Sequence, residues 1–104
     1  MASSCMTRPI ELIHVEIEDC SREMADCVRQ QAELMLRRAD GLERSYKYIA
    51  TEATEEQRIY EETESEAIMD DTRVAREREA ELGHKFHRLV MEFRIARKHE
   101  KGRG

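Results

Sequence analysis

The chain has 104 residues, 39% of them hydrophobic and 39% charged, with one proline, four glycines, no tryptophan and a net charge of −5. This balance is too polar for a wide globular core and favours long solvated helices over sheets. No apolar run approaches the roughly 18 residues that a membrane-spanning helix needs, so we expect a small, soluble all-α protein.

The cysteines indicate a reducing compartment. Cys5, Cys20 and Cys27 are an odd number without a C-x-x-C pair, and no charged-then-apolar leader precedes them, which disfavours secretion and a disulfide framework. We therefore expect a cytoplasmic protein. Cys20 and Cys27 would lie about 10 Å apart along a helix, too far for a mutual disulfide, and are expected to be buried small residues.

The first predicted element is a long helix over residues 8–39, after a flexible N-terminus at 1–7 in which Thr7 is a candidate N-cap. Its apolar positions alternate in spacings of three and four, the pattern of a coiled-coil seam. The seam consists of Ile10, Ile13, Ile17, Cys20, Met24, Cys27, Gln31, Leu34 and Arg38. Residues 12–17 also alternate like a β-strand, and a short strand there is the alternative.

A tight turn is predicted after the first helix. Gly41 can adopt the left-handed conformation that ends a helix, and Asp40 with Glu43 has the spacing of a capping box. A second helix over residues 43–69 would then run back, antiparallel, along the first. Its expected seam residues are Leu42, Tyr46, Ile49, Ala53, Tyr60 and Ala67, with Glu56 and Thr63 filling the gaps.

A third helix is predicted over residues 72–100, followed by a flexible basic tail at 101–104. The recovering apolar stripe consists of Ile68, Ala75, Leu82, Phe86, Leu89, Phe93 and Ala96. A second turn could lie near Asp70 or at Gly83, or be absent with two chains pairing, because this stripe is too large to leave in water. We favour the turn near residue 70, which gives a three-helix bundle in one domain, residues 8–100.

Charge is unevenly distributed along the chain. Residues 52–71 hold nine Asp/Glu against Arg58 alone, whereas residues 83–104 hold seven Lys/Arg against two Asp/Glu. With a turn near residue 41, the acidic segment would lie opposite residues 11–30, which cannot neutralise it. We therefore expect it to face water, the basic segment or a basic partner. The candidate partner-binding residues are Glu55, Glu56, Glu61, Glu62, Glu64 and Glu66 on the acidic face, and Lys85, Arg88, Arg94, Arg97 and Lys98 on the basic C-terminal helix.

A metal site is the alternative that the histidines raise. Glu81 and His84 have the i, i+3 spacing by which helical bundles present ligands to di-iron centres, and His87 lies one turn further. The first-helix seam has no inward-facing carboxylate to complete such a site. We therefore predict no catalytic, cofactor-binding or metal-binding residue.

Five short motifs carry a resemblance to a known family. RQQ at 29–31, RADG at 38–41, YEET at 60–63, IMDD at 68–71 and AEL at 80–82 follow the order of features in tubulin-binding cofactor A. The chain resembles this family of small acidic three-helix proteins, although it lacks the family's first-helix Gly-Val-Val-Lys-Arg-Leu pattern and its kink proline. The resemblance implies a monomeric cytoplasmic cochaperone whose helical faces bind tubulin.

Together these features predict a non-enzymatic protein–protein interaction module: an adaptor, an assembly subunit or a chaperone-like cofactor. One alternative is that the basic C-terminal helix binds a membrane surface or nucleic acid, which the overall negative charge disfavours. The other alternative is a metal-binding helical bundle. Homodimerisation stays open.

Overall fold

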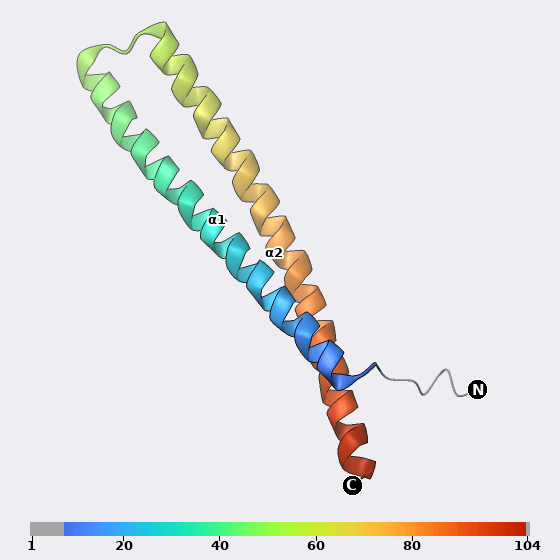
Figure 1. The fold of residues 1–104 in the computed structure, drawn as a ribbon. Helices are drawn as coiled ribbons and strands as arrows, with labels where there is room; N and C mark the ends of the chain where they lie inside the picture. The colour runs from blue at the N-terminus through green and yellow to red at the C-terminus, as the bar shows by residue number, and fades with distance from the viewer. Residues whose placement is uncertain (1–7, 104) are drawn as a thin grey trace. The chain divides into compact units, whose positions relative to one another are not determined.

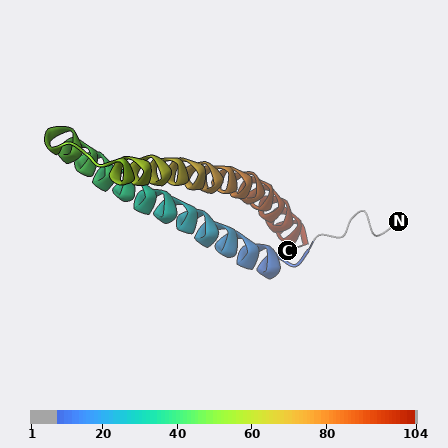
Figure 2. The same cartoon turned by 90° about the horizontal axis from the view of Figure 1, so that it is seen from above.

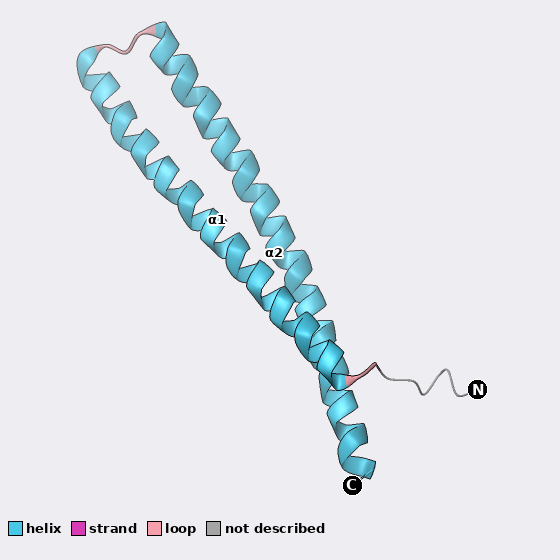
Figure 3. Ribbon diagram, in the orientation of Figure 1, coloured by secondary structure: helices cyan, strands magenta, loops and turns pink. Residues whose placement is uncertain are grey.

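Two long helices make up nearly all of the described part of the chain. A computed structural model describes residues 8–103, in which α1 spans Ile10–Thr51 and α2 spans Glu55–Arg103 (Figure 1). The all-α prediction is confirmed, and the described part of the chain contains no strand (Figure 3). The alternative strand at residues 12–17 is wrong, because these residues all lie within α1. Neither helix contains a stretch that is long and apolar enough to cross a membrane.

The start of α1 follows the single proline. The carbonyl of Pro9 accepts the first helical hydrogen bonds, from the amides of Leu12 and Ile13, and proline is tolerated there because its own missing N–H has no helical partner to lose. The predicted flexible segment at 1–7 and the Thr7 cap lie outside the described residues.

The turn between the helices lies at residues 52–54, and its prediction at Gly41 is wrong. Glu52 has a φ of 57°, the left-handed conformation that ends α1. Thr54 and Gln57 then form a capping box, in which the Gln57 amide donates to Thr54 Oγ1 (3.2 Å) and the Thr54 amide donates to Gln57 Oε1 (2.8 Å). Gly41 lies inside α1 without a positive φ.

The core is a heptad seam on each helix. On α1 the buried residues recur every seventh position as Ile13, Cys20, Cys27 and Leu34, and on α2 as Ile68, Ala75, Leu82, Leu89 and Ala96. A repeat of seven keeps one face of each helix toward its partner along a gentle supercoil. The predicted first-helix seam is therefore confirmed as a packed face through Leu34, but its last member, Arg38, is exposed, and the predicted late apolar stripe is confirmed as a packed face. Cys20 and Cys27 are buried and free.

The predicted third helix is wrong. Residues 70–72 and Gly83 lie inside α2, which continues without a break through Arg103 and includes most of the tail predicted to be flexible. The physical reason is the unbroken spacing of seven from Ile68 to Ala96, which a turn near residue 70 would interrupt. The apolar stripe that seemed to need a third helix is covered by α1.

The contacts divide the chain into two compact units. Among the described residues, the terminal unit comprises 8–25 and 80–103, and the turn unit comprises Asp26–Glu79. Within the turn unit, α1 and α2 are antiparallel and joined by the loop (Figure 2), as the pairings of Gln31 with Glu79 and of Arg44 with Glu61 show. In the terminal unit, the Cys20 thiol donates to the carbonyl of Leu82 (3.2 Å).

Candidate interaction surface

Two of the acidic-face residues are already paired with α1. Arg44 Nε donates to Glu61 Oε1 (2.7 Å), and Arg37 donates through Nε and Nη2 to Glu64 Oε1 (3.0 and 2.6 Å). These hydrogen bonds raise the pKa of both guanidinium groups. The prediction that α1 cannot neutralise this segment is wrong, because the turn at residues 52–54 places it opposite the arginines of α1 and not opposite residues 11–30.

The remaining acidic-face residues are not bonded to α1. Glu55 pairs with Arg58 on its own helix (2.7 Å). Glu56, Glu62 and Glu66 are exposed, and they form no ion pair within the described part of the chain. An acidic surface is therefore present at the start of α2, but it has half the members that the sequence predicted.

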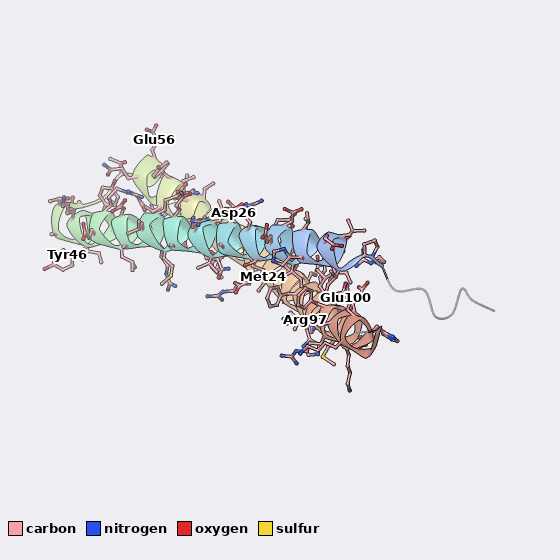
Figure 4. All side chains as sticks on the ribbon, turned by 60° about the horizontal axis from the view of Figure 1, so that its bottom comes forward. Met24, Asp26, Tyr46, Glu56, Arg97 and Glu100 are labelled. Atoms are coloured by element: carbon pink, nitrogen blue, oxygen red, sulfur yellow. The ribbon has the colours of Figure 1, made fainter. Side chains whose placement is uncertain are left out.

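The basic residues of α2 are solvent-facing. Lys85, Arg88, Arg94, Arg97 and Lys98 are all exposed, and Figure 4 shows Arg97 projecting from the helix. Lys85 contributes to lowering the pKa of Glu16, after the larger effect of Arg8. The other four make no ion pair within residues 8–103.

A second Arg–Glu cluster joins the helices in the terminal unit. Arg8 donates to both carboxylate oxygens of Glu92 (2.6 and 2.9 Å) and through Nη1 to Glu16 (2.8 Å). These bonds hold the pKa of each carboxyl below its ordinary value of 4.5 and raise the pKa of the guanidinium. Sequence reasoning missed this cluster because its members are up to 84 positions apart.

The candidate metal ligands do not converge. Glu81, His84 and His87 are all exposed on α2. Among residues 8–103, no three potential ligands from His, Cys, Asp and Glu come together in a group that could hold an ion.

An unpredicted apolar strip runs along the outside of α1 in the turn unit. Its members are spaced alternately four and three residues apart and are all exposed: Val28, Ala32, Met35, Ala39, Leu42, Tyr46 and Ile49. We call this set the α1 strip. Leu42 is 63% exposed, Tyr46 75% and Ile49 84%. Figure 4 shows Tyr46 projecting from α1 and Glu56 projecting from α2, away from one another.

The α1 strip is a second seam on the same helix. Val28 and Met35 directly follow the buried seam residues Cys27 and Leu34, and Leu42 continues the same spacing of seven, so the strip lies about 100° around the helix from the face that contacts α2. Single exposed apolar residues are ordinary, but a continuous exposed row at coiled-coil spacing is typical of an interaction surface. The predicted inward-facing role of Leu42, Tyr46 and Ile49 is wrong, because these residues form the outer face of α1.

A shallow groove borders the strip where the two helices of the turn unit meet. It encloses about 280 Å³ and is lined by Gly41, Leu42, Ser45 and Met69 among others. The groove exists because small residues replace the large apolar ones of the seam at this level. Two of the lining residues, Leu42 and Met69, are exposed.

The comparisons with known proteins provide no relative. No protein-family model, curated protein or solved structure matches the chain. The resemblance to tubulin-binding cofactor A therefore stays a prediction, and the three-helix fold that it implies differs from the two helices of the described residues.

Proposed function

We propose that the chain is a non-enzymatic protein–protein interaction module that binds through the α1 strip. The observation that carries this proposal is the exposed row of apolar side chains at coiled-coil spacing on a helix whose other seam is already packed. A helix with two seams can contact two helical neighbours at once, and only one neighbour is supplied by α2.

The energetic argument concerns the large members of the strip. Met35, Leu42, Tyr46 and Ile49 are each more than 60% exposed, and burying a side chain of this kind is worth roughly 1.5–3 kcal/mol. A helical partner that covers the row would gain several such contributions along one face. Binding of a helix through anchors spaced at three and four residues is an established mode of recognition.

The experiment that tests this proposal compares one strip variant with one matched control in native extract. Chemical cross-linking of tagged chain should yield defined adducts that Leu42→Lys removes and Val74→Lys keeps, because Val74 is similarly exposed in the same unit but lies on α2. Lysine and leucine have similar helix propensities, so both variants should keep wild-type circular dichroism. Equal adducts from all three proteins would refute the proposal.

Tubulin is the named partner to test first, because of the family resemblance. Purified tubulin added to the tagged chain should shift its sedimentation if the cochaperone role holds, and Leu42→Lys should abolish the shift. No shift at micromolar tubulin would remove this partner while leaving the general proposal to the extract experiment.

A second candidate function is binding of an acidic surface by the basic side of α2. Arg88, Arg94, Arg97 and Lys98 are exposed without ion pairs in the described chain, and Met91 and Ile95 are exposed beside them. Basic amphipathic helices bind anionic lipids and phosphates. Vesicles with about 30% anionic lipid, or duplex DNA, should then bind the chain at low salt and release it near physiological salt, and Arg94→Gln with Arg97→Gln should weaken binding. Unchanged binding by that variant would exclude this face.

A further inference from the structure

The order of large and small side chains along the α1 strip determines in which direction a partner helix can pack against it. The positions that directly follow the packed seam are large: Val28, Met35, Leu42 and Ile49. The positions between them are alanine at 32 and 39 and tyrosine at 46. A partner that presents small residues opposite the large ones, and large residues opposite the alanines, would fit this surface without voids.

A second copy of the same strip has this property when it runs antiparallel. If residue n faces residue 81 − n, Ala39 faces Leu42 and Ala32 faces Ile49, while Met35 faces Tyr46. Each pairing occurs twice because the dimer is symmetric. In two of the three kinds of pairing a large side chain packs against an alanine. In the third, Met35 contacts Tyr46, and methionine forms favourable contacts with aromatic rings. A parallel copy would instead place alanine against alanine and leucine against leucine.

We propose that the chain forms an antiparallel homodimer in which the α1 strips of two copies pack against each other, centred between residues 40 and 41. This inference rests on the proposed function, since it names the partner of the same surface. The pairing is isologous, so one self-complementary patch closes the assembly at two copies.

The charges that border the strip agree with this arrangement. Positions 29, 36 and 43 flank one side and positions 31, 38 and 45 the other. Flanking side chains on one edge of the interface meet the same edge of the second copy, about 3 Å along the axis from the seam register. Leu36 is therefore nearest Glu43 of the second copy, and Arg38 is nearest Ser45 of the second copy. No flanking pair brings like charges together, which would oppose association.

The size of the strip sets how tight the dimer should be. The strip positions that face each other run from Ala32 to Ile49, about 26 Å at 1.5 Å per residue, and with helices packed about 10 Å apart they cover roughly 260 Å² of each copy. This is below the area of about 800 Å² per partner in stable complexes. The dimer should therefore be weak and dissociate on dilution.

Analytical ultracentrifugation of the full chain tests association. The mass should rise from monomer to dimer between about 1 μM and 1 mM. Leu42→Lys should raise the Kd at least about 100-fold, since it places two charges in the central layer, whereas Val74→Lys should leave it unchanged. A chain that is monomeric throughout, a larger assembly, or a dimer indifferent to Leu42→Lys would overturn the proposal.

A matched pair of substitutions at Leu36 tests the direction of the helices. Leu36 is 68% exposed, so neither substitution should disturb the fold. In the antiparallel register Leu36→Lys gains two contacts with Glu43 of the second copy and Leu36→Glu gains two repulsions. We expect the Kd of the lysine variant to be about tenfold lower at low salt. In a parallel dimer Leu36 would face the uncharged Gln31 of the second copy, so the lysine and glutamate variants would have equal Kd values. That result would overturn the antiparallel arrangement.

The two proposals fail in different ways. If the chain stays monomeric while Leu42→Lys abolishes cross-linking to another protein in extract, the homodimer is refuted and the interaction module stands. If Leu42→Lys changes neither self-association nor cross-linking, both are refuted.

Discussion

Arg8 connects segments that are distant in sequence, because it bonds Glu16 on α1 and Glu92 on α2 at once. Exposed ion pairs are usually worth little, but here one guanidinium uses a bidentate contact and a second carboxylate, geometry that strengthens such bonds. Its distance from Glu92 along the chain means that the contact exists only when the terminal unit is folded. Arg8 is therefore a local reporter of that unit.

Replacing Arg8 by Gln should make stability less dependent on pH in the acidic range. The pKa of Glu16 and of Glu92 is lower in the folded chain than its ordinary value of 4.5, chiefly because of the hydrogen bonds with Arg8. A depressed folded pKa contributes stability that is fully present above the unfolded value and is lost as pH falls through the folded value.

The difference in melting temperature between wild type and Arg8→Gln should therefore be present at pH 7, shrink as pH falls below 4.5, and vanish below the depressed pKa values of the folded chain. Thermal melts by circular dichroism across this range measure it. Arg58→Gln is a suitable control, because its partner Glu55 is on the same helix and is mostly exposed. A difference that stays constant down to pH 2 would contradict the assignment.

The helices show which parts of the sequence could be read and which could not. The seam of α1 from Ile10 to Leu34 and the stripe of α2 from Ile68 to Ala96 were predictable, because buried residues repeat at a fixed spacing. After Leu34 the large apolar residues of α1 continue only on its outer face, at Leu42, Tyr46 and Ile49, and such a change of face looks like the start of a new helix when only spacing is considered. Gly41, just before it, supported that error.

The capping box at the true turn was visible in the sequence. Thr54 and Gln57 have the Thr-x-x-Gln spacing, but Asp40 and Glu43 offered a competing one. The pairing of the two seams decides between these two capping boxes. The α1 seam from Ile13 to Leu34 packs against the α2 seam from Leu89 back to Ile68. This antiparallel register places the turn near residue 52. The exposed strip, the Arg37–Glu64 contact and the Arg44–Glu61 contact depend on the same register. Because the turn was predicted at the wrong residue, none of the three could be predicted from the sequence.

Gly41→Ala should stabilise the chain by about 0.5–1 kcal/mol. Glycine inside a helix is disfavoured relative to alanine by about this amount because of its greater freedom in the unfolded state. A Cβ at this position would be 3.5 Å from Glu61 Oε2 and 3.6 Å from Arg44 Nη2, ordinary contact distances.

Urea unfolding followed by circular dichroism measures the effect of Gly41→Ala. Gly83→Ala is the matched comparison, since nothing lies within 4 Å of its Cβ position and it should gain a similar amount. Destabilisation by Gly41→Ala alone would mean that residue 41 has the left-handed conformation of a helix end, as the sequence first suggested.

Across the chain, net charge and local charge lead to different conclusions. The net charge of −5 disfavours binding to anionic surfaces, yet the acidic residues opposite Arg37 and Arg44 are partly neutralised within the turn unit while Arg88, Arg94 and Arg97 stay open to solvent. Which surface meets a partner therefore follows from which charges the fold pairs. That information resides in the register and cannot be obtained from composition.

Deletion of residues 85–104 should unfold the N-terminal part of α1 and spare the turn unit. The deletion removes Leu89 and Ala96, which are buried in the terminal unit, and the partner of Arg8. Residues 10–25 would then be a short helix with little tertiary support, and helices of this length are marginal in water. The turn unit keeps its own buried residues on both helices: Cys27 and Leu34 on α1, and Ile68 and Ala75 on α2.

Hydrogen exchange followed by mass spectrometry measures this directly. Amides in residues 10–25 should exchange at close to unfolded rates in the truncated chain, while those in residues 30–48 and 60–76 keep most of their protection, because local stability follows local packing. Loss of protection in both units would show that they fold as one cooperative block. Retained protection at residues 10–25 would show that the C-terminal part of α2 is dispensable for folding. The basic face of that part would then have only a binding role.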